Sequence, residues 1–162
     1  MQGNIKENMQ GHIRYLGAEE KPATRALYEA AFPEDSKEFT DYYYSWKTKD
    51  NEIIVMEGAC TDSSFHVMIH LNPYNVCING QAVEIPYLVA VATAPEQRRK
   101  GKMGAVMRRA LRDMGRKGIP FTFLLPADPA YYKGQGFEFF PCQEPFIAHR
   151  ESIAANTDCQ IA

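Results

Sequence analysis

The chain has 162 residues, about the size of one ordinary domain, and a fold of that length buries roughly two-thirds of the surface of the unfolded chain. Hydrophobic residues make up 45% of it and charged residues 23%, a composition that excludes the disordered and fibrous classes. The net charge of -2 argues against nucleic acid or an anionic membrane as the main partner, because both require many uncompensated Lys and Arg side chains.

The sequence also limits location and domain organisation. No stretch approaches the roughly 18 to 20 apolar residues that cross a bilayer, and residues 1–12 lack a signal-peptide core, so we expect a cytoplasmic protein. We expect one domain over residues 12–150, after a tail (1–11) that is disordered or vector-derived and before a C-terminal extension (151–162). Four widely spaced cysteines argue for reduced thiols and against zinc: Cys60, Cys77, Cys142 and Cys159.

The first third of the chain predicts one strand and two helices. The strand covers residues 12–16, and a helix follows over 19–32, with apolar residues at helical spacing at Ala23, Leu27, Ala30 and Ala31. Pro33 ends that helix, and Asp35 or Ser36 caps the next one. The second helix carries an aromatic face that we expect in the core, formed by Phe39, Tyr42, Tyr43 and Trp46.

The remainder predicts strands followed by alternating helices and strands. Strand patterns cover 52–57, 65–77 and 81–93, and Asn79-Gly80 between the last two is typical of a tight antiparallel hairpin, with Pro73 expected to break or bulge its first strand. A helix over 102–117, a buried strand over 119–125, a short helix or turn from Asp128 to Tyr132 and a last strand over 137–140 follow. This order predicts an α/β (mixed α+β) fold whose sheet is antiparallel first and parallel later, flanked by helices.

The densest chemical signal is the junction between the strand ending at Pro95 and the helix beginning beyond Gly101. Backbone N–H groups at a helix N-terminus bind anions, and Gly101 and Gly104 would let the backbone approach a phosphate closely. Half of the 18 Lys and Arg residues lie between Arg98 and Lys117, although a solvated basic helix face is the alternative explanation for those on the helix. The glycine spacing matches neither a P-loop nor a Rossmann fingerprint, so the ligand that we expect is a pyrophosphate other than a nucleoside triphosphate or a dinucleotide.

Two motifs at these positions resemble the GNAT acetyltransferase superfamily, in particular the N-terminal catalytic domain of its Eis-like group. The run from Val91 to Gly101, VATAPEQRRKG, matches the family's strand followed by [QR]-x-x-G. Residues 132–137, YKGQGF, match its Tyr followed by a Gly-aromatic pair. The likeness covers residues 12–140 and implies the GNAT fold. It departs from the family at Met103, where most members have a small residue.

The resemblance implies that acetyl-CoA is the co-substrate, without a metal, and that the acceptor is an amine. Backbone groups of Val91, Ala92 and Thr93 would hold the acetyl and pantetheine part, with Ala127 and Asp128 beside the thioester. Tyr132 would be the general acid that returns a proton to sulfur, a role that suits a phenol protonated at neutral pH. The pyrophosphate would bind to the segment made of Arg98, Arg99, Lys100, Gly101, Lys102, Met103 and Gly104.

The general base stays open at this point. Eis-like enzymes take a carboxylate from a further C-terminal domain that has no counterpart here, and other members place a base where this chain has Tyr87. Glu84 lies three residues earlier, which on a strand points its side chain to the opposite face. A metal site at His66 and His70 lacks a third ligand at suitable spacing.

These alternatives define the function hypotheses. The first is N-acetylation of a small-molecule or peptide amine, with aminoglycosides or lysine side chains suggested by the Eis-like resemblance. The second, motivated by the missing base, is an acyl-CoA-binding sensor without turnover or a fragment of a larger Eis-like enzyme. Nucleic-acid binding by the basic helix is the third and weakest. The oligomeric state is open, with a homo-oligomer among the alternatives.

Overall fold

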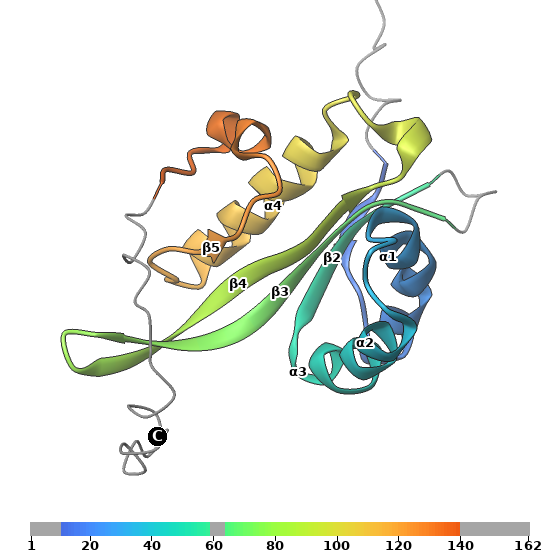
Figure 1. Ribbon diagram of the computed structural model, residues 1–162. Helices are drawn as coiled ribbons and strands as arrows, with labels where there is room; N and C mark the ends of the chain where they lie inside the picture. Colours follow the sequence, from blue (N-terminus) through green and yellow to red (C-terminus); the bar gives the residue numbers. More distant parts are fainter. Residues whose placement is uncertain (1–10, 59–63, 140–162) are drawn as a thin grey trace, which may run out of the picture.

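A computed structural model describes residues 11–58 and 64–139, which form a twisted five-stranded sheet in the order β1-β2-β3-β4-β5 (Figure 1). Strands β1 to β4 pair antiparallel and β5 pairs parallel to β4, which confirms the mixed sheet predicted from the sequence. The strands are β1 (Ile13–Tyr15), β2 (Glu52–Glu57), β3 (Phe65–Ile78), β4 (Gln81–Thr93) and β5 (Phe123–Leu124).

Helices cover both faces of the sheet (Figure 1). Helix α4 (Lys102–Arg116) lies across one face, while α1 (Arg25–Ala31), α2 (Lys37–Tyr42) and α3 (Thr48–Asp50) lie against the other. Short helical turns join these elements: η2 (Ala18–Thr24), η3 (Tyr43–Lys47), η4 (Pro95–Gln97), η5 (Pro129–Tyr131) and η6 (Lys133–Gln135).

The core beneath α4 is apolar and follows the predicted periodicity. The helix was expected over 102–117 and ends at Arg116, and it buries Val106, Met107 and Ala110 completely. Its apolar stripe packs on alternate side chains of β2 and β3, which point to one face because successive strand residues alternate. The sheet side of this cluster consists of Ile54, Met56, Val67, Ile69, Leu71 and Leu88.

The opposite face contains a buried polar cluster beneath α1 and η3. The Tyr43 hydroxyl lies 3.0 Å from His70 Nδ1, and Asn51 Nδ2 donates to Asn72 Oδ1 at 3.0 Å. His70 is completely buried, and its Nε2 has no hydrogen-bond partner among the described residues. Burial and the nearby Lys21 ammonium lower the pKa of His70 to about 3, so the imidazole is neutral.

The predicted helix over 19–32 is divided. Residues 18–24 form the 3₁₀ turn η2 around Pro22, which has no N–H for an α-helical bond, and only Arg25–Ala31 are α-helical. The shift in winding moves Thr24 and Tyr28 to the inner side. Ala23 and Ala30, two of the residues with the predicted helical spacing, are exposed.

The predicted aromatic core face is also wrong. Tyr43 is buried, whereas Phe39, Tyr42 and Trp46 are 46%, 50% and 61% exposed. Phe39 and Tyr42 lie on the outer side of α2, and the helix then continues into the π-helical turn η3, whose wider winding moves Trp46 off the 3.6-residue spacing. The buried stripe of this segment is Thr40, Tyr43 and Thr48 instead.

Three strand predictions change at their ends. The buried strand expected over 119–125 pairs only at Phe123–Leu124, and it is not buried: these two residues are half-buried, and Phe121 and Leu125 are exposed. Residues 137–139 of the expected last strand are not a strand, and residue 140 lies outside the described residues. Pro73 does not break β3, which runs through it to Ile78. The hairpin turn is confirmed, with positive φ at Asn79 (50°) and Gly80 (79°).

Candidate active site

A bulge in β4 marks the first part of the site. The β3–β4 register shifts between Met68 and His70, and Ala90 has a left-handed φ of 50°. Such a bulge leaves backbone groups outside the ladder and bends the strand. The predicted residues Val91, Ala92 and Thr93 follow directly: Val91 packs against the α4 core and Ala92 is buried on the other face.

Strands β4 and β5 separate beside this bulge. They pair only at Tyr87–Phe123 and Leu88–Leu124, so the described part of β5 leaves the edge of β4 without a partner strand from Val89 onward. The chain then continues through Ala127 and Asp128, both exposed. Asp128 caps η5 by accepting from the Ala130 N–H at 2.9 Å, so its carboxylate is engaged in local structure.

The backbone between β4 and α4 is shaped for an anion. Arg99 (φ 63°) and Gly101 (φ 72°) are both left-handed, and Gly101 is the N-cap of α4 without a side-chain cap. The first helical hydrogen bond is donated by Ala105 to the Gly101 carbonyl. The N–H groups of the first turn therefore point out of the helix end, where the macrodipole adds positive potential.

The four basic side chains of this turn have different roles. Arg98 Nε donates to the Thr93 carbonyl at 3.2 Å and ties the turn to β4, while Arg99 and Lys100 are exposed. Lys102 points away from the turn: its ammonium contacts His66 Nδ1 at 2.8 Å and Gln97 Oε1 at 2.7 Å. Burial lowers the pKa of Lys102. Lys102 thus links the turn to His66 on β3, whereas Arg99 and Lys100 remain exposed.

Gln135 is a contact that the sequence analysis missed. A Cβ at the buried Gly104 would meet Gln135 Nε2 at 3.0 Å, so the glycine lets η6 pack on the first turn of α4. Gln135 Oε1 is buried without a hydrogen-bond partner among residues 11–58 and 64–139. No motif pointed to it, because a glutamine in a Gly-rich turn has no distinctive spacing. Met103, the unusual residue here, packs half-buried against the α4 core.

Tyr132 lies half-buried between η5 and η6. Its ring packs against the α4 core and contacts Phe137 edge-on at 5.7 Å. Burial raises its pKa above the ordinary value, which keeps the hydroxyl protonated at neutral pH. The turn from Asp128 to Tyr132 was predicted and is confirmed.

Neither candidate base on β4 suits that role. Glu84 is exposed and lies opposite Asn75, while Tyr87 lies opposite Asn72, so the three-residue offset points their side chains to opposite faces, as predicted. Burial raises the pKa of the Tyr87 hydroxyl, with a smaller opposing effect of a hydrogen bond from the Leu125 backbone. Its ring stacks on Phe123 at 5.0 Å, so Tyr87 joins β4 to β5 where they begin to separate.

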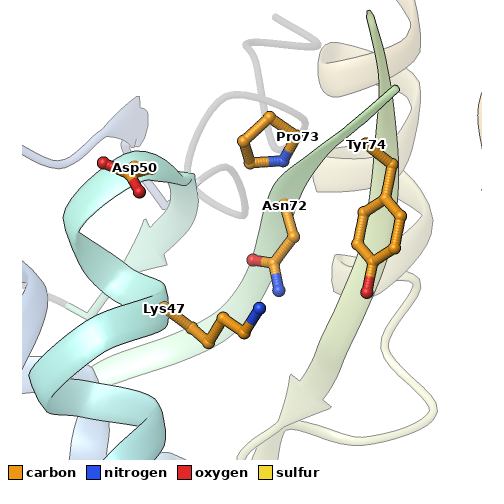
Figure 2. Close-up of a pocket in the computed structure, with 5 residues that line it drawn as sticks. All are labelled: Lys47, Asp50, Asn72, Pro73 and Tyr74. Carbon is orange, nitrogen blue, oxygen red and sulfur yellow. The ribbon is translucent and has the colours of Figure 1, made fainter. Parts of the chain in front are cut away.

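A small pocket lies apart from this constellation, between α3 and β3 (Figure 2). Its volume is about 80 Å³ and its lining is mostly polar, formed by Lys47, Asp50, Asn72, Pro73 and Tyr74. Across residues 11–58 and 64–139, no three His, Cys, Asp or Glu side chains are grouped to hold a metal ion. In the same residues, no helix is long and apolar enough to cross a bilayer.

Solved structures share the fold. At 19% identity and a TM-score of 0.67, the chain matches a GCN5-related N-acetyltransferase from Ralstonia eutropha JMP134, covering 85% of this chain and 99% of that one. A predicted acetyltransferase from Clostridium acetobutylicum, solved with acetyl-CoA, matches at 11% identity and a TM-score of 0.66, covering 84% of this chain and 95% of that one.

A longer protein contains the same fold. A conserved protein of unknown function from Enterococcus faecalis V583 matches at 19% identity and a TM-score of 0.67, over 77% of this chain and 31% of that one. The chain thus spans about a third of that relative. The comparison with curated proteins finds no match. The model of the acetyltransferase (GNAT) domain matches residues 12–140. With this match over most of its length, the chain belongs to the GNAT acetyltransferase family.

Proposed function

We propose that this protein transfers the acetyl group of acetyl-CoA to a primary amine, with Tyr132 as the general acid. The observation that carries the proposal is the course of β4: it bulges at Ala90, loses β5 beyond Leu88, and leads through η4 and the turn at residues 98–101 into the uncapped N-terminus of α4. One continuous edge thus offers free backbone groups for an amide-containing chain, followed by a positive end for phosphates.

The residues of the turn fit a pyrophosphate. The N–H groups of Lys102, Met103 and Gly104 precede the first helical hydrogen bond, and the exposed Arg99 and Lys100 supply the mobile charge. We assign Lys102 to holding the turn against His66 rather than to phosphate contact, because its ammonium already has two partners. Gly104 keeps this helix end narrow enough for Gln135 to lie against it.

Acetyl-CoA supplies an activated thioester, and the chain supplies positioning and a proton. We assign the backbone N–H groups beyond the bulge, at Val91 to Thr93, to polarising the thioester carbonyl. The amine nitrogen forms the new bond to the carbonyl carbon, the carbon–sulfur bond breaks with its electron pair on sulfur, and the Tyr132 hydroxyl gives its proton to that sulfur. The raised pKa of Tyr132 keeps this proton available at neutral pH.

Glu84 cannot act as the general base that removes a proton from the amine. That carboxylate lies seven residues from Val91, about 23 Å along an extended strand. Tyr87 keeps its proton because its pKa is raised. We therefore propose that water takes the proton or that the amine binds neutral, and we expect the rate to rise with pH as more of the amine is deprotonated.

We further propose that the acceptor is a small-molecule or peptide amine, and that the chain belongs to the Eis-like group because of the motifs at 91–101 and 132–137. The Enterococcus faecalis protein, of which this chain spans about a third, supports a relationship to longer proteins.

The first experiment is calorimetric titration of the chain with acetyl-CoA, beside an Arg99→Glu, Lys100→Glu variant and a control variant, Arg112→Glu, on the exposed side of α4. Micromolar binding that is lost in the double variant and kept in Arg112→Glu supports the proposed cradle. A folded wild-type chain that does not bind acetyl-CoA would refute it.

The second experiment separates an enzyme from an acyl-CoA-binding module, which the missing base leaves in play. For an enzyme, Tyr132→Phe lowers kcat by about 10²- to 10⁴-fold while acetyl-CoA affinity stays the same. If the wild-type chain binds acetyl-CoA but shows no turnover across a panel of amines, and Tyr132→Phe changes nothing, the binding module is the better description.

A further inference from the structure

The β3–β4 hairpin extends past the rest of the sheet. Pairing of β2 with β3 ends at Leu71, and pairing of β5 with β4 begins at Tyr87, so residues 73–78 and 81–86 form a two-stranded ribbon, which we call the arm. Figure 1 shows the arm projecting beyond α3 and α4. A two-stranded ribbon is only marginally stable in water unless something packs on it.

The pairing pattern shows which backbone groups of the arm face outward. In an antiparallel ladder, hydrogen-bonded and non-hydrogen-bonded pairs alternate. The two-residue turn makes Ile78–Gln81 a hydrogen-bonded pair, and five steps further Pro73 lies opposite Pro86, a pair that cannot be hydrogen-bonded because proline has no N–H. The pair next to the turn and the proline pair at the root of the arm therefore predict the same alternation of hydrogen-bonded and non-hydrogen-bonded pairs. The outward N–H groups on the β3 edge of the arm are therefore those of Asn75 and Cys77.

This β3 edge lacks the protection that the other sheet edges have. Free edges are normally blunted by shortness, charge or proline. Strand β1 has three residues and contains Arg14, β5 has two residues, and the β4 edge of the arm presents Glu84. The β3 edge over residues 73–78, PYNVCI, has no charged residue and only Pro73 at its root.

One face of the arm is apolar and reaches this edge. Tyr74, Val76 and Ile78 alternate on the β3 side, opposite Ile85, Val83 and Gln81. Ile85, near the root of the arm, is completely buried, whereas Val76, Ile78 and Val83 are half-buried. Tyr74 is 46% exposed, and its ring contacts Tyr87 at 5.4 Å, so the apolar strip continues onto the body of the sheet. The other face carries Asn75, Cys77, Ala82 and Glu84, all exposed.

We propose that this edge is a dimer interface in which the β3 arms of two copies pair antiparallel about a two-fold axis at Val76. In this register Asn75 and the partner's Cys77 exchange backbone hydrogen bonds, and the symmetric pair does the same. Val76 meets the partner's Val76, and Tyr74 meets the partner's Ile78, so the apolar strips become continuous. A second copy is the fitting occupant because a two-fold interface must be self-complementary, and an uncharged edge brings no like charges together.

In this register, the pocket of Figure 2 lies where the turn of the partner's arm has to be accommodated. Opposite Pro73 comes the partner's Asn79, at the tip of the partner's turn. Pro73 lines the pocket together with Lys47 and Asp50, close to the start of β2, where Glu52 pairs with Leu71 (Figure 2). Its volume of about 80 Å³ and its polar lining suit a side-chain amide.

The test compares two valines that face each other across the arm. Val76→Lys places two ammonium groups one strand spacing apart at the axis, about 5 Å, whereas Val83→Lys places them three spacings apart, about 14 Å. Both residues are half-buried on the same face of the arm, which makes Val83→Lys the control for Val76→Lys. We expect a wild-type dimer by sedimentation velocity, a dissociation constant raised at least about tenfold in Val76→Lys, and a smaller change in Val83→Lys.

A cross-link tests the register itself. In a Cys77→Ser background, Val76→Cys should form an intermolecular disulfide that peptide mapping places between two copies of position 76, because opposed non-hydrogen-bonded positions have close Cβ atoms. A folded wild-type chain that sediments as a monomer at all concentrations overturns the proposal. So does a dimer that both lysine variants weaken equally or leave intact.

Discussion

The two faces of the sheet differ in what they bury: both have apolar clusters, and the face beneath α1 and η3 buries polar side chains as well. Beneath α4 the buried side chains are apolar, with Met107, Val106 and Ile69 completely enclosed. Beneath α1 and η3, the imidazole of His70 and the amide of Asn51 are buried beside tyrosine rings. An apolar face depends on volume and shape alone, whereas a polar one also depends on every donor having an acceptor. The stability contributed by the face beneath α4 should therefore be independent of pH, whereas the stability contributed by the face with His70 should depend on pH.

The largest expected effect belongs to the apolar face. Met107→Ala removes a fully buried side chain from the middle of α4 and should lower the free energy of unfolding by about 2–5 kcal/mol, through lost transfer energy and a cavity. Urea denaturation at several pH values measures this. The loss should be the same at each pH, and a loss that varies with pH would break the contrast between the faces.

The polar face should lose stability in acid. The pKa of His70 is about 3 in the folded chain and near 6.5 when unfolded, so between these values the unfolded state binds more protons. Stability contributed by the neutral imidazole is complete above pH 6.5 and falls with decreasing pH, by about 1.4 kcal/mol for each pH unit.

The measurement is urea denaturation between pH 6.5 and 5, where carboxylates contribute little because their pKa values lie lower. His70→Gln should flatten the slope, although it also lowers the stability at every pH. Equal slopes in the wild-type chain and His70→Gln would show that His70 does not carry the effect.

The same contrast explains which parts of the fold the sequence could predict. On the α4 face the spacing of Met103, Val106, Met107, Ala110 and Met114 is regular, and helix, bounds and burial followed from it. On the other face the buried stripe includes Lys21, Thr24 and Thr40, which no hydrophobic period detects. The π-helical turn then shifted the aromatic residues, so Trp46 was assigned to the core and is exposed.

The sequence likewise predicted some features of the candidate site and missed others. The strand-turn-helix at 91–104 was predicted because glycine spacing and clustered charge are local features. The direction of Lys102 was not, since its partner His66 lies 36 residues away on β3. Gln135 was missed for a related reason: what distinguishes it is its contact with Gly104 across the fold. Sequence patterns predict backbone shape here, and tertiary contacts decide which side chains remain free.

A smaller effect is expected at the start of α2, on the polar face. Ser36 caps this helix by accepting from the Phe39 N–H at 3.2 Å. Ser36→Ala should lower the free energy of unfolding by about 1 kcal/mol because that N–H loses its partner. Thermal unfolding measures it, with Ser45→Ala at an exposed position of η3 as the control. Equal effects of the two changes would remove the capping explanation.

Gly104→Ala, in the first turn of α4, should change stability least, but it should also change the binding of acetyl-CoA. An added Cβ meets Gln135 Nε2 at 3.0 Å and Arg108 Nη1 at 3.2 Å, both ends of flexible side chains that can move aside. Alanine also favours a helix over glycine by about 0.5–1 kcal/mol, so the two effects on stability nearly cancel.

Gln135 already lies against the first turn of α4, so its displaced side chain would move into the space around that turn, where we place the pyrophosphate. Gly104→Ala should therefore weaken acetyl-CoA binding while stability changes by less than about 1 kcal/mol. Gly115→Ala is the matched control: it lies in the same helix with open space around its Cβ, so it should gain helix stability and keep acetyl-CoA affinity. If both variants bind acetyl-CoA as the wild-type chain does, the first turn of α4 is not the phosphate site, and the bulge at Ala90 would have to hold the cofactor without it.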